Sequence, residues 1–112
     1  MALTIQTASP NALLTAIKKA IDEKHVETWT YDDAGDFTHT PSQWKNRAWL
    51  RPKMEAGTLR FGLVGQQGVA MSKLIYGVYH GRFIEMLLVH FDDSFSIARA
   101  SAVTDSSIDN FI

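Results

Sequence analysis

The sequence predicts an α+β fold, a two-layer sandwich in which two amphipathic helices cover one face of an antiparallel or mixed sheet of roughly four to six strands. The first observation is a β-hairpin pattern over residues 48–65, AWLRPKMEAGTLRFGLVG. The second is the helical spacing of apolar residues in two segments, 10–24 and 82–92. The third is the short spacing of the remaining β-rich segments, which favours antiparallel neighbours.

The composition is that of an ordinary globular domain. The 112 residues are 46% hydrophobic and 21% charged, close to the average for soluble proteins. A chain of this size buries about two-thirds of its unfolded surface, so a core can form without disulfides or metals. Cysteine is absent, which excludes disulfides, thiolate catalysis and cysteine-ligated metal sites. We expect residues 1–112 to form a single domain, of which 105–112 could be a loose tail.

The sequence predicts a cytoplasmic protein without membrane contact. No apolar run approaches the roughly 18 residues that cross a bilayer. The N-terminus lacks the basic-then-apolar order of a secretory signal. The absence of cysteine fits a reducing compartment.

A first helix is predicted over residues 10–24, after a short lead-in over residues 1–8. Ser9 suits the N-cap, and Pro10 suits the first helical position, where its missing N–H has no partner to lose. Charged residues lie on one side of this segment, and apolar residues recur at helical spacing on the other. These apolar residues are Leu13, Leu14, Ile17, Ala20 and Ile21.

Two short strands are expected next, over 26–31 and 37–40. The first segment is rich in β-forming residues, and the aspartate-rich stretch 32–36 between them has turn composition. Three aspartates beside a glycine also suggest a calcium loop, but their spacing does not match the EF-hand pattern. We expect a solvated turn and no metal site.

The hairpin over 48–65 is predicted to turn at Ala56-Gly57. This turn directs one apolar set of side chains to the face that meets the core. Pro52 cannot donate a ladder hydrogen bond, so its strand is expected at a sheet edge or bulged there. The predicted cross-strand pairs are Met54 with Leu59, Pro52 with Phe61, and Leu50 with Leu63.

The segment after the hairpin is harder to assign. Residues 73–79 are predicted as a strand, and residues 82–92 as the second helix. The alternative is a hairpin turn at His80-Gly81 with 82–91 as the returning strand. Residues 96–103 alternate in polarity and are predicted as a strand. The helix prediction depends on an apolar stripe formed by Ile84, Leu87, Leu88, Phe91 and Phe95.

A cluster of cations is predicted on the outer face of the hairpin. Residues 45–60 contain five Lys or Arg residues against one Glu, a net charge of +4 in a chain of net charge −1. Lys53 is predicted to face Arg60 across the strands, and such opposed like charges are mildly destabilising. An anionic partner, or the chain's own aspartates, would relieve this repulsion. The candidate partner-binding residues are Arg47, Trp49, Arg51, Lys53 and Arg60, because Trp and Arg are typical of interface hot spots.

A second candidate site is an anion-binding site at His80 and Arg82. In the strand-then-helix prediction these residues lie at a helix N-terminus, where free N–H groups and the helix dipole favour an anion. An imidazole and a guanidinium could also serve as an acid–base group and a charge stabiliser. The alternative is that His80 is a loop residue with local hydrogen bonds.

The leading hypothesis is a small non-enzymatic interaction module of the inhibitor, immunity or adaptor type. It would bind another protein with an acidic surface through the exposed sheet face. The runner-up is a small anion-binding domain or enzyme centred on His80 and Arg82. The third hypothesis is single-stranded nucleic-acid binding through Trp49 and its neighbouring cations, which the net charge disfavours.

Catalytic signatures are not found in the sequence. The histidines have no zinc-site spacing, the serines lie in no G-x-S-x-G motif, and the glycines do not form a P-loop. These observations favour a protein with no cofactor and no catalytic activity. A homodimer through the open sheet face or a free edge strand is a further expectation.

Overall fold

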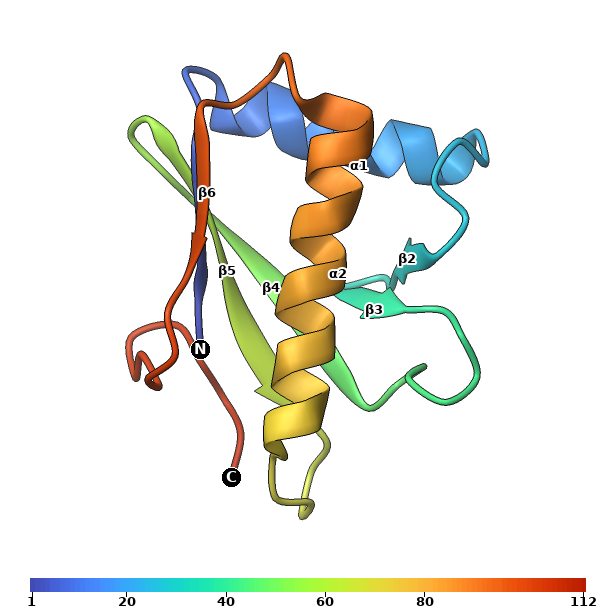
Figure 1. The fold of residues 1–112 in the computed structure, drawn as a ribbon, viewed down its shortest axis with the longest axis vertical. Helices are drawn as coiled ribbons and strands as arrows, with labels where there is room; N and C mark the ends of the chain where they lie inside the picture. Colours follow the sequence, from blue (N-terminus) through green and yellow to red (C-terminus); the bar gives the residue numbers. More distant parts are fainter.

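The computed structural model describes all residues 1–112 and contains one six-stranded sheet and two helices (Figure 1). The strands lie in the order β2-β3-β4-β5-β1-β6, and all neighbouring pairs are antiparallel. The elements are β1 (Leu3–Gln6), α1 (Pro10–Asp22), β2 (Trp29–Tyr31), β3 (Phe37–His39), β4 (Ala48–Glu55), β5 (Thr58–Gly65), α2 (Lys73–Phe91) and β6 (Ile97–Ala100).

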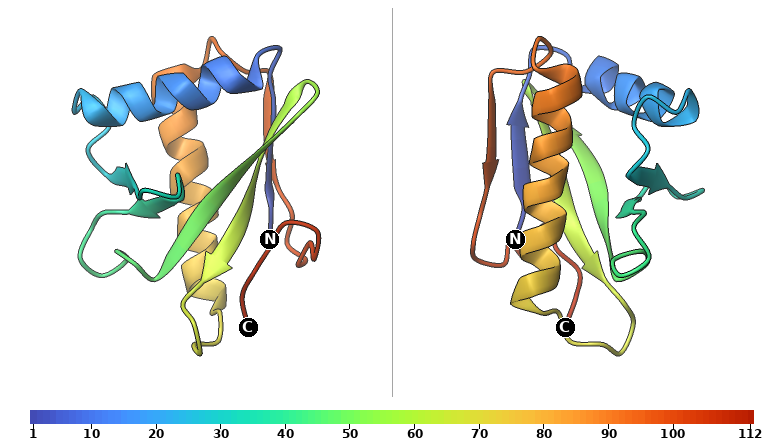
Figure 2. Two further views of the ribbon diagram at one scale, coloured as in Figure 1. Left: turned by 180° about the vertical axis from the view of Figure 1, so that it is seen from behind. Right: turned by 45° about the vertical axis from the view of Figure 1, so that its right-hand side comes forward.

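The helices and the sheet form the predicted two-layer α+β sandwich, which is confirmed. One apolar cluster joins both helices to the strands, with Ile17 of α1 and Phe83 of α2 fully buried in it. Phe83 packs edge-on against Phe61 of β5, with ring centroids 4.8 Å apart. Seen from behind, the central part of β4 has no helix in front of it (Figure 2). The core therefore lies on one face of the sheet, and the other face is open for other contacts.

The hairpin of β4 and β5 has the predicted turn and register. Met54 pairs with Leu59, Pro52 with Phe61, and Leu50 with Leu63. Gly57 adopts a φ of 70°, a left-handed conformation that glycine tolerates without strain. β3 and β4 share only one register pair, Phe37–Leu50, so the half of β4 that contains Pro52 has a free outer side. That free side explains how a residue without an N–H is accommodated in this strand.

Residues 1–8 were predicted to be a short lead-in, but Leu3–Gln6 form β1, an inner strand of the sheet. β1 pairs with β5 on one side and with β6 on the other. Leu3 and Ile5 are fully buried. The prediction was wrong because four residues that alternate in polarity carry too little local signal. Their strand assignment depends on two partners that lie far away in the sequence.

The second helix begins much earlier than predicted. Lys73–Tyr79 form its first two turns rather than a strand, and the Ser72 hydroxyl accepts a hydrogen bond from the Ile75 N–H at 3.1 Å. The predicted stripe is confirmed at Leu87, which is fully buried, and at Ile84, Phe91 and Phe95, which pack against the core, but not at Leu88, which is 55% exposed. The buried side also includes Tyr79 and Phe83, which were not predicted. The β-branched and aromatic residues of this segment favour a strand locally, and burial against the sheet overrides that preference.

The remaining helix and strand predictions are confirmed within their segments. α1 ends at Asp22, two residues before the predicted end. The strands β2, β3 and β6 lie inside the predicted segments 26–31, 37–40 and 96–103. Residues 105–112, which the sequence suggested could form a loose tail, instead lie against β5. Asn110 donates to the Leu63 carbonyl at 2.8 Å and accepts from the Gly65 N–H at 2.9 Å.

Candidate interaction surface

The predicted partner-binding residues lie along β4 and β5, on the side of the sheet away from the core. Lys53 pairs with Arg60 as predicted, Arg60 pairs with Thr4 of β1, and Thr4 pairs with Arg99 of β6. Directly paired residues point to the same face, so these cations form a row across neighbouring strands. We use the name cationic face for Arg47, Trp49, Arg51, Lys53, Arg60 and Arg99.

Arg51 is bound within the chain by Asp36, which lies directly before β3. Its Nε donates to Asp36 Oδ1 at 3.1 Å, and its Nη2 donates to Oδ2 at 2.9 Å. This hydrogen bonding raises the pKa of Arg51. The Asp36 carboxylate is only 7% exposed, whereas half of the Arg51 side chain remains accessible. Arg51 is therefore both the partner of a buried carboxylate and part of the surface.

Arg60 is held by two carboxylates. Its Nη2 lies 2.6 Å from Asp105 Oδ2, and its Nη1 lies 3.7 Å from Glu55 Oε2. Hydrogen bonds from Ser107 and from Arg60 lower the pKa of Asp105 to about 2. The Arg60 side chain is only 19% exposed. Its charge is therefore largely neutralised by the chain itself.

The opposition of Lys53 and Arg60 is relieved by a neighbouring carboxylate. The Glu55 Oε2 atom lies 3.7 Å from Lys53 Nζ as well as from Arg60 Nη1. Because Lys53 and Glu55 are both well exposed, their ion pair contributes little to stability. Lys53 is therefore free to exchange this contact for one with a partner.

Three further residues of the cationic face have side chains available to a partner. Trp49 is half-buried on β4 and pairs in register with Val64. Arg47, directly before β4, and Arg99, on β6, are exposed and form no ion pair. Arg99 was not among the predicted residues. Its alternation with Ala98 and Ala100 was visible in the sequence, but its place beside Thr4 depends on β1, which was not predicted.

The C-terminal residues border the cationic face. A Cβ atom on Gly62, the residue paired with Arg51, would lie 2.1 Å from the backbone oxygen of Ile108. Asp109 Oδ1 accepts a hydrogen bond from the Leu63 N–H at 2.8 Å. The segment that follows β6 therefore crosses β5 at close range and leaves β4 accessible.

His80 and Arg82 do not have the position in the helix on which the predicted anion site depended. They lie in the middle of α2, whose N-terminus is at Lys73, so the premise of a helix N-terminus is wrong. His80 is 5% exposed, and its ring nitrogens lie 2.6 Å from the Tyr76 carbonyl oxygen and 2.7 Å from that of Met1. Arg82 is exposed and pairs with Glu85 at 3.6 Å. The two side chains therefore have separate partners within the chain.

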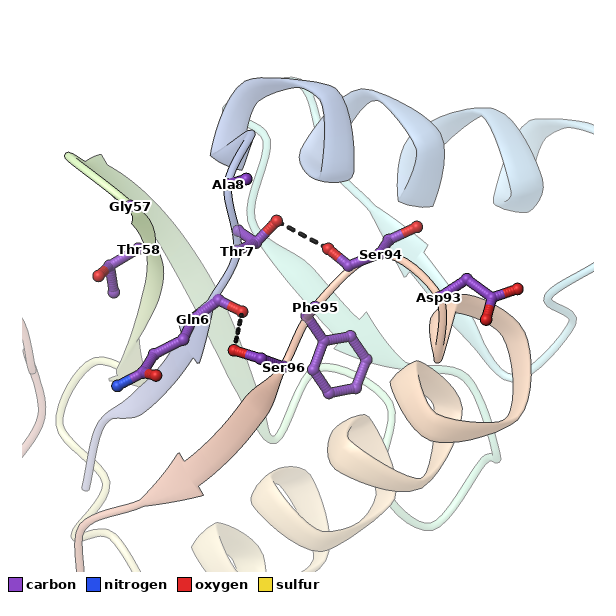
Figure 3. A pocket seen from close by; sticks show the side chains of 9 residues that line it. All are labelled: Gln6, Thr7, Ala8, Gly57, Thr58, Asp93, Ser94, Phe95 and Ser96. Atoms are coloured by element: carbon purple, nitrogen blue, oxygen red, sulfur yellow. Dashed lines mark hydrogen bonds between the residues drawn. The ribbon is translucent and has the colours of Figure 1, made fainter.

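The concavity drawn in Figure 3 lies where the hairpin turn meets the segments before α1 and after α2. Thr7 Oγ1 donates to the Ser94 carbonyl oxygen at 2.7 Å, and Ser96 Oγ donates to that of Gln6 at 3.3 Å (Figure 3). Asp93 is the one charged residue in its lining. Its polar lining therefore consists of hydroxyl, amide and backbone groups and this one carboxylate, with no histidine, lysine or cysteine.

No group of three or more His, Asp or Glu side chains is arranged to hold a metal ion. In the aspartate-rich turn, Asp36 is bound to Arg51, and Asp32 Oδ1 accepts a hydrogen bond from the Asp36 N–H at 3.0 Å. These carboxylates therefore organise the turn before β3. Neither α1 nor α2 combines the length and the apolar character of a membrane-spanning helix.

Comparison of the chain with protein-family models, with curated proteins and with solved structures gave no match.

Proposed function

We propose that this protein is a small non-enzymatic interaction module that binds an acidic surface of another protein through its cationic face. The observation that carries the proposal is the half-buried indole of Trp49 on an open sheet face, with the exposed cations Arg47, Arg51 and Lys53 along the same strand region. Trp and Arg together are typical of the residues that dominate binding energy at protein interfaces.

The chemistry of the face favours carboxylates as ligands. Asp36 and Asp105 of the chain itself already bond Arg51 and Arg60. The contact of Arg51 with Asp36 is bidentate, which is the arrangement that guanidinium groups commonly form with carboxylates. The chain has a net charge of −1 and so lacks the overall positive charge typical of nucleic-acid-binding domains, which disfavours a phosphate backbone as the ligand.

Two features limit which cations can recognise a partner. Arg60 is mostly covered and is bonded on both sides of its guanidinium group. Arg51 neutralises a buried carboxylate, so replacing it would disturb the fold. Lys53 and Arg99 are exposed and without a structural role, and they lie in one row across the face. These two residues are the ones to test.

The experiment compares two double charge reversals in affinity capture from the lysate of the source cells, followed by quantitative mass spectrometry. Lys53→Glu with Arg99→Glu changes the cationic face, and Lys19→Glu with Lys24→Glu makes the same change in net charge at exposed positions on and just after α1. Circular dichroism verifies that both variants fold. We expect the first variant to lose the captured acidic protein and the second to retain it.

Equal capture by both variants would contradict the proposal. Capture of nucleic acid in place of protein, with an affinity that falls steeply between low and physiological salt, would replace it by the nucleic-acid hypothesis.

A further inference from the structure

The outer side of α2, away from the sheet, is a second exposed surface. Leu74 is 66% exposed and Leu88 is 55% exposed, although both are large apolar residues. A shallow groove runs along this side of the helix from Lys73 to Glu85. Its floor lies at Gly77 and Gly81, which have no side chains. No other part of the chain covers these residues.

Lys73, Gly77, Gly81 and Glu85 are spaced four residues apart and form one straight row on the helix surface. A Cβ atom added to Gly77 or to Gly81 would meet nothing within 4 Å. The fold therefore has room for alanine at both positions, and alanine is the better helix former. Because Gly77 and Gly81 have no side chains, a partner can approach the backbone of α2 closely at these two positions.

The two ends of this row carry opposite charges. Lys73 lies in the first turn of α2, where the helix dipole disfavours a cation, and it forms no ion pair within the chain. Glu85, at the other end, has one weak contact with Arg82 at 3.6 Å between exposed side chains. If a second copy of this row runs in the opposite direction, Lys73 of each copy lies next to Glu85 of the other.

We infer that a second copy of this chain docks on the groove, with the two α2 helices antiparallel and related by a twofold axis between Gly77 and Gly81. In this arrangement Gly77 lies over Gly81 of the other copy, and Lys73 meets Glu85 at both ends of the contact. Rows of residues four apart pack against each other in the commonest class of helix pairs. The symmetry repeats every favourable contact, as in other twofold dimers.

The arrangement also covers the exposed side chain of Leu74. The antiparallel register that pairs Lys73 with Glu85 brings Leu74 next to Ile84 of the other copy, and Ile84 is already partly buried against the core. The cationic face lies on the opposite side of the sheet from the core and from α2. Self-association through α2 therefore leaves the proposed partner site free, and the two proposals can fail separately.

Sedimentation velocity of the purified chain over a range of concentrations tests the inference. We expect a concentration-dependent dimer. Gly81→Leu places a side chain in the groove at a position where a Cβ atom meets nothing within 4 Å, and it should weaken the dimer at least tenfold. Thr15→Leu, at an exposed position of α1, is the matched control and should leave the dimer unchanged.

A charge exchange tests the antiparallel register. Lys73→Glu and Glu85→Lys should each weaken the dimer at least tenfold, and the variant with both substitutions should recover it. A chain that stays monomeric at every concentration would overturn the inference, because the groove would then not bind a second copy. A dimer unaffected by Gly81→Leu, or charge variants without recovery in the double substitution, would overturn it as well.

Discussion

Arg51 donates two hydrogen bonds to the carboxylate of Asp36, from Nε at 3.1 Å and from Nη2 at 2.9 Å. This pair joins β4 to the turn before β3 at the point where the two strands share only one register pair. The Asp36 carboxylate is nearly buried and depends on Arg51 for its neutralisation.

Removing Arg51 should therefore destabilise the fold. We expect Arg51→Ala to lower the free energy of unfolding by about 1–3 kcal/mol, because a nearly buried carboxylate loses its partner. The matched variant Lys53→Ala removes an exposed cation from the same strand and should change stability by less than about 0.5 kcal/mol. Urea unfolding of both variants measures the difference, and equal effects would contradict the role assigned to Asp36.

Two glycine substitutions should have opposite effects on stability. Gly62→Ala places a Cβ atom 2.1 Å from the Ile108 oxygen, so the C-terminal residues must move. We expect a loss of about 1–3 kcal/mol, as in other overpacked sites. Gly81→Ala meets no atom and should stabilise the monomer by up to about 1 kcal/mol. Unfolding at low protein concentration tests both, and a neutral Gly62→Ala would show that the C-terminal residues do not lie on β5.

His39 should make the stability of the protein depend on pH below neutrality. Burial lowers the pKa of His39 from its ordinary value of 6.5, although a hydrogen bond with the Thr28 carbonyl oxygen opposes this effect. Below pH 6.5 the unfolded chain therefore binds a proton that the folded chain does not, and the free energy of unfolding falls as the pH falls. Urea unfolding at several pH values should show this slope, with a smaller slope in His39→Asn. An identical slope in the variant would assign the pH dependence to other groups.

Asp105 should contribute in a separate, more acidic range. Its pKa is lowered from 3.8 to about 2, so its contribution to stability is complete above pH 3.8 and is lost as the pH falls toward 2. Asp105→Asn should remove this acid-dependent part while leaving the slope near pH 6 intact. Acid titration followed by circular dichroism separates the two ranges, and an unchanged acid transition in the variant would count against the contact with Arg60.

Much of the fold could be predicted because its strongest signals are local. The hairpin register follows from one turn at Ala56-Gly57 and from apolar residues that recur at every second position. The first helix follows from Pro10 at its first position and from the spacing of its apolar residues, whereas Ser9 occupies the N-cap without a side-chain capping hydrogen bond. β1 and the first half of α2 could not be predicted, since β1 has only four residues and α2 begins with residues that favour strands. In both cases the deciding contacts are distant in the sequence.

The candidate site was predictable in part for the same reason. The register of the hairpin placed Lys53 opposite Arg60 correctly. The neutralising residues Asp36 and Asp105 lie in other segments, so their pairing with Arg51 and Arg60 is visible only in the folded chain. Arg99 joins the face only through β1.

Site-specific photocrosslinking in the lysate can show whether the cationic face contacts an acidic protein. A photoreactive amino acid is placed at position 53 on β4 in one sample and at position 19 on α1 in another, and each is irradiated in the lysate. We expect a crosslinked acidic protein from position 53 and none from position 19. Crosslinks from position 19 alone, or to nucleic acid from position 53, would contradict the proposal.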